Sequence, residues 1–256
     1  PLIPRSVERV RDEVYSHFDL VFRQYFYEPY AEMTKYIPVG PSLYGWGQAA
    51  MSGLRSKRAS ERTNFCFFSG RMKYIDSDIT APNPTLAEID RSHMKRVSLN
   101  LYYRTSEGGG GMWVRDKAIK EELLLCDVRE RKLTTKEHWQ ALEDTAFALC
   151  PRGNNVETFR FYEALETGAI PILVRSENRE DDFLQHGFFK KYPGPVLGSW
   201  DELPGYIFSM YDPRRVKELD TLQKAMGVWY ERFKETVRED LSRSLDGLMA
   251  DRMNST

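Results

Sequence analysis

Two apolar runs with a helix-length stretch between them constrain the fold of this chain more than any other feature. Residues 146–149 form the first run, which is followed by Cys-Pro-Arg-Gly, and residues 169–174 form the second. Continuous apolar runs of this length are typical of strands that are covered on both faces, as in a parallel sheet. Between the runs, apolar or small residues recur at helical spacing, namely Phe161, Ala164, Leu165 and Gly168. The sequence therefore predicts a strand–helix–strand unit whose helix packs one face on the sheet.

The rest of the chain continues this alternation. A third apolar run at residues 65–68 predicts another buried strand, and the apolar stripe from Val216 to Leu245 predicts a long C-terminal helix packed along a core. The other expected elements are strands at residues 20–22, 36–40 and 97–103 and helices at residues 4–15, 85–95 and 117–125. Strands that alternate with helices favour an α/β fold with a Rossmann-like parallel sheet.

Size and charge limit the classes of function. With 256 residues, the chain is long enough for one large domain, or for one domain and part of another. Its net charge of −1 gives no general attraction to nucleic acid, so we expect no nucleic-acid partner. No apolar run approaches the roughly 18 residues that a membrane helix needs.

The cysteines and histidines do not form a metal-binding pattern. The 3 cysteines (Cys66, Cys126 and Cys150) include no CxxC pair, and the 4 histidines include no HxxxH pair, so we expect no metal site. One disulfide with one free thiol and three reduced cysteines both remain open. The chain has neither GxGxxG nor GxxxxGK[ST], which disfavours a dinucleotide cofactor and an NTPase.

The loop after residue 149 is suited to phosphate. Residues 151–155, Pro-Arg-Gly-Asn-Asn, lead directly into the predicted helix. Open α/β sheets bind ligands beyond the carboxyl ends of their strands, where a helix N-terminus offers unpaired N–H groups to a phosphate. Arg152 adds a planar set of donors, and Glu163 has two oxygens that can accept from ribose hydroxyls. Arg160 lies close enough along the helix to orient Glu163.

A structural interpretation of the same residues is equally supported by their types alone. Arg160 and Glu163 would then form a surface ion pair, which contributes little to stability. Asn154 or Asn155 would simply cap the helix. Residue types alone do not decide between this interpretation and phosphate binding.

The same stretch resembles a known family. The sequence CPRG followed by RFYEALETGAIPILV is similar to the donor-side signature of exostosin-type glycosyltransferases, which are glycosyltransferase family 47 and its relatives. Within this group the chain looks most like the ribitol xylosyltransferase branch, which has an Arg-x-Tyr segment, a strand ending in Pro-φ-Gly and a Phe-x-Gly strand. The corresponding segments here are residues 23–26, 37–40 and 67–70.

The resemblance implies a GT-B fold, in which two Rossmann-like domains face a cleft and the C-terminal domain binds the nucleotide-sugar. Residues 1–60 would then be the remainder of the acceptor-side domain with a linker, and residues 61–256 the nucleotide-sugar-binding domain. By position in the family's pattern, Arg152 would contact the diphosphate and Glu163 the ribose. The other donor-binding residues implied are Gly70, Arg71, Gly153, Asn154, Asn155, Thr158 and Arg160.

The resemblance also implies a reaction, which is the inverting transfer of a sugar from a nucleotide-sugar to a glycan hydroxyl. We expect a UDP-sugar as the donor, no metal or other cofactor, and a general base that the sequence does not identify. The implied location is the lumenal side of the Golgi or another secretory-pathway membrane, with any membrane anchor upstream of Pro1. A homodimer or heterodimer is compatible with this reading. Two alternatives stay open: a non-catalytic exostosin-like module that stabilises a partner enzyme, and a nucleotide-binding α/β protein of another reaction class.

Overall fold

The computed structural model describes residues 13–41, 57–69, 94, 102–103, 123–129, 133–152, 156–176, 179 and 182–254. The chain divides into two compact units. The sheet unit consists of Gly40–Arg175 and Pro193–Val228, and the aromatic unit consists of Pro1–Val39, Ser176–Tyr192 and Trp229–Thr256. The expected domain boundary between residues 60 and 61 stays a prediction.

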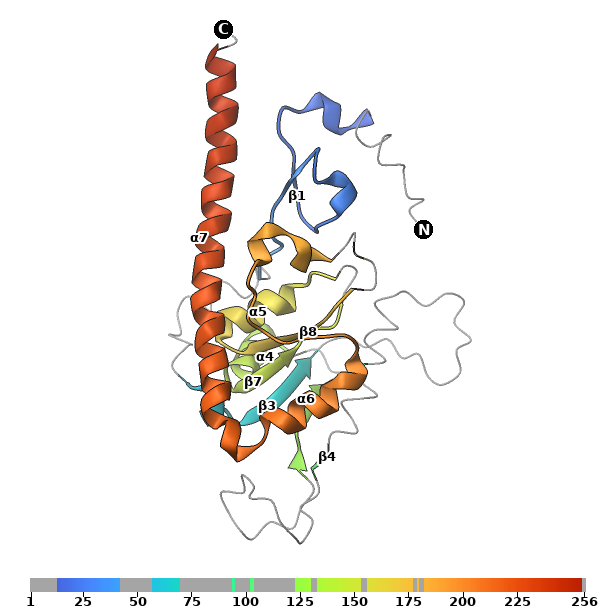
Figure 1. The fold of residues 1–256 in the computed structure, drawn as a ribbon, viewed down its shortest axis with the longest axis vertical. Helices are drawn as coiled ribbons and strands as arrows, with labels where there is room; N and C mark the ends of the chain where they lie inside the picture. Colours follow the sequence, from blue (N-terminus) through green and yellow to red (C-terminus); the bar gives the residue numbers. More distant parts are fainter. Residues whose placement is uncertain are drawn as a thin grey trace, which may run out of the picture. The chain divides into compact units, whose positions relative to one another are not determined.

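The sheet unit is built on five parallel strands in the order β6-β3-β7-β8-β9 (Figure 1). Their bounds are β3 Asn64–Ser69, β6 Cys126–Arg129, β7 Thr145–Leu149, β8 Ile170–Val174 and β9 Val196–Leu197. Numbered along the chain, these strands run 2-1-3-4-5 across the sheet, which is a doubly wound arrangement. The α/β class predicted from the sequence, with its parallel sheet and long C-terminal helix, is confirmed.

The described helices are mostly short, apart from the last. The α-helices are α4 Thr135–Glu143, α5 Phe159–Thr167, α6 Leu203–Met210 and α7 Val216–Asn254, the last with 39 residues. Single turns of 3-10 helix occur at η1 Tyr15–His17, η2 Glu28–Tyr30, η3 Ala59–Glu61, η5 Phe183–Gln185, η6 Gly187–Phe189, η7 Trp200–Glu202 and η8 Pro213–Arg215. The helix α7 contributes residues to both units.

Helices cover both faces of the parallel sheet (Figure 1). On one face, Phe67 of β3 and Ala148 of β7 are buried in one cluster with Ala164 of α5. On the other face, the ring of Tyr206 in α6 lies 5.6 Å from the ring of Phe147. Because consecutive residues of a strand point to opposite faces, Phe147 and Ala148 belong to different layers. This explains why β7 reads as a continuous apolar run.

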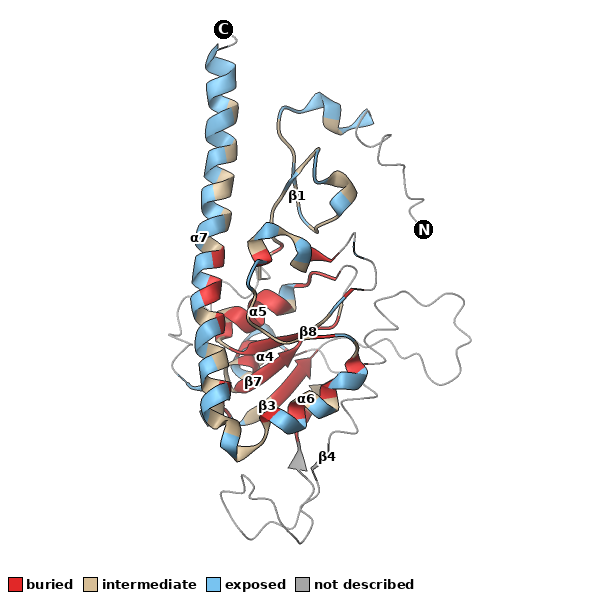
Figure 2. Ribbon diagram, viewed as in Figure 1, coloured by how far each residue is buried: buried red, intermediate tan, exposed pale blue. Residues whose placement is uncertain are grey.

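The helix α5 is buried around most of its circumference (Figure 2). On its predicted apolar face, Phe161 and Ala164 are 0% exposed. Thr167 is also 0% exposed, and its hydroxyl donates to the backbone carbonyls of Glu163 and Ala164. The helix ends at Gly168, whose φ of 71° is a left-handed conformation that glycine adopts without strain. The polar side chains of such a helix lie in the protein interior and need partners there.

Arg62 connects three elements of the sheet unit. Its side chain donates to the carbonyl oxygens of Leu142 at 3.3 Å, Thr145 at 2.9 Å and Thr167 at 2.9 Å. These carbonyls lie near the end of α4, at the start of β7 and at the end of α5. Burial lowers the pKa of Arg62 to about 10, so the guanidinium stays protonated at neutral pH. One buried cation therefore satisfies backbone acceptors from three elements.

A disulfide between Cys66 and Cys126 cross-links β3 and β6. The two residues are opposite one another in the parallel pair, with Cα atoms 4.3 Å apart. Cys150 is buried and carries a free thiol. Of the two alternatives that the sequence left open, the structure therefore has one disulfide and one free thiol.

The aromatic unit is held together largely by ring packing. Its two short strands, β1 (Phe22–Arg23) and β2 (Lys35–Tyr36), pair in parallel. The ring of Phe189 lies 6.3 Å from Trp229 and 5.2 Å from Phe233, and both partners come from α7. Such close aromatic pairs contribute beyond the area that they bury.

Several local expectations are corrected. The strands expected at residues 20–22 and 36–40 are shifted, because β1 is Phe22–Arg23 and β2 is Lys35–Tyr36. The helix predicted at residues 117–125 is wrong at Leu123–Leu124, which form strand β5 and pair antiparallel with β4 (Tyr102–Tyr103). Its last three residues, Leu123 to Leu125, are consecutive apolar residues, which suits a strand better than one face of a helix. Neither β6 nor α4 was expected. The apolar stripe of α7 is buried at Leu219, Met226, Trp229 and Phe233, whereas Leu245 is 43% exposed. None of the helices in the described ranges has the length and apolar character to cross a membrane.

Candidate functional site

The carboxyl ends of β3 and β7 define the candidate site. These two strands are neighbours, and the chain leaves them in opposite directions, since β6 lies beyond β3 and β8 lies beyond β7. Open α/β sheets bind their ligands in the crevice at such a divergence. Residues 70–71 directly follow β3, and residues 152–163 begin just after β7. The two segments to which the resemblance assigns donor binding therefore start at the same edge of the sheet.

Part of the expected site can be located in the structure. The residues Gly70, Arg71, Gly153, Asn154 and Asn155 lie outside the described residues. Arg152, Thr158, Arg160 and Glu163 are described, and all four lie between the end of β7 and the middle of α5. Their roles in binding stay predictions.

Glu163 is a buried carboxylate with a histidine partner. Glu163 is 7% exposed, and one of its carboxylate oxygens, Oε2, lies 3.0 Å from Nε2 of His138 in α4. When Glu163 is ionised its carboxylate can only accept hydrogen bonds, and Nε2–H of His138 is then the donor of this contact. The ring of His138 also lies 6.4 Å from that of Phe67. The contact restrains the Glu163 side chain, because Glu163 is buried and its partner His138 is held on another helix.

Arg160 ties the first turn of α5 to the end of β3. Its Nε donates to the carbonyl oxygen of Ser69 at 3.0 Å, and its guanidinium carbon lies 4.9 Å from the centre of the Phe68 ring. Ser69 is the last residue of β3. The positive charge of Arg160 is therefore held at the point where β3 and α5 meet, which is where a bound anion would benefit from it.

Two further buried polar residues lie at the start of α5. Thr158 occupies the N-cap position, but its side chain makes no capping bond. Its hydroxyl is buried and has no hydrogen-bond partner among the residues that the structure describes. Glu157 is 3% exposed and accepts a hydrogen bond from the hydroxyl of Tyr162. A buried hydroxyl without such a partner is suited to bonding a ligand atom, since leaving it unpaired is costly.

Cys150 lies between β7 and Arg152 but is not suited to nucleophilic chemistry. The thiol is fully buried, and burial raises its pKa well above the usual value of a cysteine. Because the thiolate is the reactive form, Cys150 is unreactive at neutral pH. Its position indicates core packing beneath the site.

The described side chains therefore combine one oriented carboxylate with cationic groups at one edge of a parallel sheet. Arg152 and Arg160 can attract an anionic group, and Glu163 can accept from a diol. This combination fits a nucleotide, which carries both phosphates and a ribose. Within the described ranges, no group of three or more His, Cys, Asp or Glu side chains is arranged to hold a metal ion.

The sequence analysis missed two residues of this site, His138 and Glu157. A signal for α4 was present, because Thr134 and Glu137 have the spacing of a capping box. The structure contains this box, in which Glu137 accepts from the backbone of Thr134 at 2.8 Å. The contact between His138 and Glu163 follows only from the packing of α4 on α5, which no local pattern encodes.

Comparison with known proteins shows a match to a family model and to individual relatives. A family model described as RXYLT1 C-terminal domain matches residues 115–248, which include all of the described site residues from β7 to α5. Human ribitol-5-phosphate xylosyltransferase 1 is 26% identical over 136 residues, covering 44% of this chain and 30% of that protein. The protein of the same name from Danio rerio is 25% identical over 167 residues, covering 58% of this chain and 37% of that protein.

A shorter match is to a differently named protein. Exostosin-1 from Drosophila melanogaster is 39% identical over 49 residues, which cover 19% of this chain and 6% of that protein. The chain thus spans about a third of the length of the two xylosyltransferases, whose matched shares are 30% and 37%.

Proposed function

The chain belongs to the family described as RXYLT1 C-terminal domain, and from this premise we propose that it binds the nucleotide-sugar donor of a glycosyltransferase. Membership confirms the exostosin-like resemblance expected from CPRG and RFYEALETGAIPILV, including its ribitol xylosyltransferase-like branch. The proposal goes further, to donor binding by this chain.

One observation carries the proposal. Glu163 is 7% exposed, its Oε2 lies 3.0 Å from Nε2 of His138, and it is part of the helix that follows the divergence of β3 and β7. A buried, oriented carboxylate at the ligand-binding edge of a doubly wound sheet is better explained by recognition of a diol than by stability alone, because buried charges are costly to keep. Arg152 lies between β7 and α5, where it would meet the diphosphate.

The proposed reaction is a displacement with inversion at the anomeric carbon of the sugar. The acceptor hydroxyl attacks this carbon while a general base takes its proton, and the bond to the nucleoside diphosphate breaks. Negative charge develops on the leaving diphosphate, and the N-terminal end of α5 together with Arg152 would stabilise it. We propose that these groups provide the stabilisation without a bound metal. The two-domain GT-B fold, with the base on the acceptor side, is part of the same proposal.

The names of the relatives favour a particular substrate pair. Two of them are named for transfer of xylose and for ribitol 5-phosphate. We propose a UDP-pentose, with UDP-xylose as the first donor to test, and a hydroxyl of a glycan or phosphorylated polyol as the acceptor. No nucleic-acid partner is proposed.

The disulfide supports a location in an oxidising compartment. Disulfides persist in secreted and lumenal proteins and are rare in the cytosol. Cys66 and Cys126 are bonded to one another, so we propose the lumen of the Golgi or of another secretory-pathway compartment.

The test is titration calorimetry of the protein with UDP, GDP, UDP-xylose and UDP-glucose. We expect UDP and one UDP-sugar to bind in preference to GDP, and Glu163→Ala and Arg152→Ala each to weaken binding about tenfold or more, as expected for charged hydrogen-bonding groups. Glu166→Ala is the matched control, because Glu166 lies on the same helix but is more exposed and lies outside the predicted site.

Each alternative has its own result in this titration. Equal binding of free nucleotides and their sugar conjugates, with no preference for a sugar, would favour a nucleotide-binding protein of another class. Selective donor binding without transfer, when the longer protein is assayed with acceptors, would favour a non-catalytic module. Binding that neither Glu163→Ala nor Arg152→Ala changes would show that the donor site lies elsewhere.

A further inference from the structure

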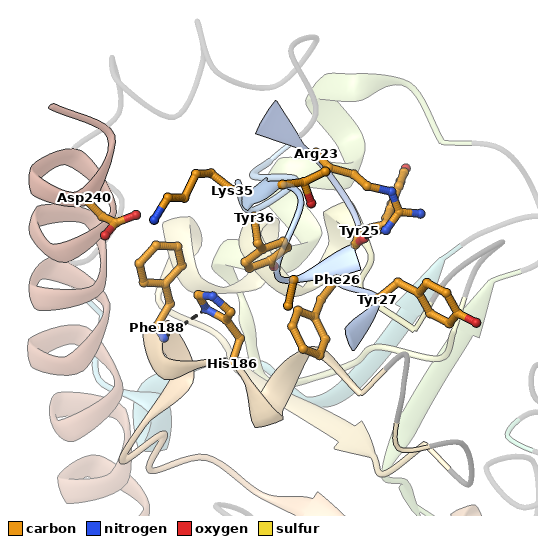
Figure 3. Close-up of a pocket in the computed structure, with 11 residues that line it drawn as sticks. Arg23, Tyr25, Phe26, Tyr27, Lys35, Tyr36, His186, Phe188 and Asp240 are labelled. Carbon is orange, nitrogen blue, oxygen red and sulfur yellow. Dashed lines mark hydrogen bonds between the residues drawn. The ribbon is translucent and has the colours of Figure 1, made fainter. Parts of the chain in front are cut away.

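A pocket lies within the aromatic unit, and none of the residues proposed to bind the donor lines it. Its volume is about 180 Å³. Its walls come from β1, β2, the turn between them, the segment of η5 and η6, and α7 (Figure 3). The side chains on which the argument depends are Arg23, Phe26, Lys35, Tyr36, His186 and Phe188. We call this cavity the aromatic pocket.

The aromatic wall of this pocket is fixed in advance of any ligand. The ring of His186 lies 4.7 Å from Tyr36, 4.4 Å from Phe188 and 5.6 Å from Phe26. Nδ1 of His186 accepts from the backbone N–H of Phe188 at 3.2 Å, which fixes the ring and leaves Nε2–H as its donor. Rings held by one another lose little freedom when a ligand packs against them, and this preorganisation favours binding.

The charges around the aromatic pocket favour an anion. Arg23 and Lys35 line it from neighbouring strands, and Asp240 is its single lining carboxylate. Asp240 is already paired with Arg243 at 3.6 Å, which offsets its charge. Burial lowers the pKa of His186, against the opposing effect of Asp240, so the ring is neutral at pH 7. In Figure 3, Lys35 and Asp240 lie at one end of the pocket and Arg23 lies at the other.

Arg23 is held in place by its surroundings. Its Nη1 donates to the carbonyl oxygen of Tyr25 at 2.9 Å, and its guanidinium carbon lies 4.6 Å from the centre of the Tyr30 ring. Tyr25 has a φ of 64°, a left-handed conformation that non-glycine residues seldom adopt. Such conformations persist where the surrounding structure requires them, and here the carbonyl of Tyr25 is the one that anchors Arg23.

The size of the pocket limits what it can bind. Pockets for drug-sized ligands have volumes of about 300–1,000 Å³, so a cavity of about 180 Å³ holds a smaller group. Flat rings suit the apolar C–H faces of a sugar or polyol, whereas Nε2–H of His186 and the hydroxyls of tyrosines suit its oxygens. Arginine and lysine then suit a phosphate or carboxylate on the same group.

We propose that the aromatic pocket binds a single sugar-sized or polyol-sized group that carries a negative charge, either phosphate or carboxylate. Assigning this group to the acceptor rests on the proposed transferase function, whereas the binding itself does not. The aromatic pocket would then select acidic over neutral acceptors.

Two histidines allow both sites to be observed in one experiment. The protein labelled with ¹³C-histidine reports on the aromatic pocket through His186 and on the donor site through His138, with the signals assigned by His186→Gln and His138→Gln. D-ribose 5-phosphate and D-glucuronate are the anionic probes. D-ribose, D-glucose and inorganic phosphate are the controls, and UDP is the probe for the donor site.

We expect at least one anionic sugar to shift the His186 signal and leave the His138 signal in place. Lys35→Met should weaken this binding about threefold to fivefold, the effect of removing one exposed charge pair, and Lys35→Arg should restore it. Lys190→Met makes the same change in the same unit outside the pocket and should have no effect. A response to ribose 5-phosphate alone identifies phosphate as the anionic group, and a response to glucuronate alone identifies carboxylate.

Four results would overturn the proposal. The first is that neither anionic probe shifts the His186 signal at about 10 mM, a concentration that mostly saturates a site with a Kd near 1 mM. The second and third are that neutral sugars, or inorganic phosphate, bind with the same affinity as the anionic sugars. The fourth is that Lys35→Met binds the anionic sugar as tightly as the unmodified protein. The proposed donor site fails separately, if UDP leaves the His138 signal unmoved.

Discussion

The carboxylate of Glu163 is held by the imidazole of His138 at 3.0 Å, and this contact makes a prediction about nucleotide binding. His138→Phe removes the donor but retains a ring, and we expect it to weaken UDP binding about tenfold, the effect of losing one hydrogen bond to a charged group. His138→Gln should bind UDP almost as well as the unmodified protein, because the amide nitrogen of glutamine reaches the position of Nε2. Titration calorimetry measures both affinities.

The unfolding midpoints of the two variants provide the control for this prediction. If His138→Phe unfolds far earlier than His138→Gln, its weaker binding would reflect lost structure. Similar midpoints with different affinities would identify His138 as a residue that positions Glu163. Equal loss of affinity in both variants would contradict that role.

The second prediction at the scale of one residue concerns the reactivity of the Cys150 thiol. Burial raises the pKa of its thiol, so the reactive thiolate is scarce even at pH 9. We expect iodoacetamide to label the folded protein very slowly and to label one thiol rapidly after unfolding in urea, because the other two cysteines form a disulfide. Mass spectrometry counts the labels. Rapid labelling of Cys150 in the folded protein would mean that the region after β7 opens to solvent.

The residues of the candidate site were predictable only in part. Arg152 and Glu163 were found because the CPRG loop and the helix after it form a continuous local pattern. His138 was not found, because its role depends on contact between two helices that are separated by β7 in the chain. Glu157 was also missed, since its burial depends on how α5 lies against the sheet.

At the scale of elements, the contacts of Arg62 with α4, β7 and α5 predict that the stability of the sheet unit depends strongly on this one side chain. It is 7% exposed and donates to carbonyls of Leu142, Thr145 and Thr167. We expect Arg62→Met to lower the free energy of unfolding by about 3 kcal/mol, because buried carbonyls lose their donors. Urea denaturation measures the change.

Arg58→Met is the matched control for Arg62. The Arg58 side chain is 69% exposed and pairs with Glu61 on the surface. Surface pairs of this kind contribute little, so the free energy of unfolding should stay close to that of the unmodified protein. An equal effect of the two substitutions would show that the buried contacts of Arg62 do not stabilise the sheet unit.

The elements that the sequence predicted and those that it did not differ in how they are buried. The strands β3, β7 and β8 lie in the interior of the sheet and are covered on both faces, so burial requires continuous apolar runs. The edge strand β6, Cys126–Arg129, contains Asp127 and Arg129, which form an ion pair, and its pattern is too polar to stand out. The helix α4 contains mostly polar residues and buries only Trp139 and Leu142, so it has no strong apolar stripe.

At the scale of the whole molecule, the disulfide belongs to only one of the two compact units. Cys66 and Cys126 both lie in the sheet unit. The aromatic unit is assembled from three separate segments of the chain, which are held largely by ring contacts. Because a disulfide acts mainly by restricting the unfolded chain, its loss should affect the unit whose unfolding it restricts.

Hydrogen exchange can therefore test whether the two units unfold independently. The disulfide joins residues separated by 60 positions, and the chain-entropy relation gives about 4 kcal/mol for a loop of that length. Reduction should accelerate amide exchange in β3 and β7 about a thousandfold wherever exchange requires unfolding of the sheet unit. Exchange in residues 183–189 of the aromatic unit should stay unchanged. The double variant Cys66→Ala/Cys126→Ala should match the reduced protein and respond no further to reductant. Equal acceleration in both units would instead mean that they unfold as one cooperative body, and the disulfide would then stabilise the aromatic pocket as well as the sheet.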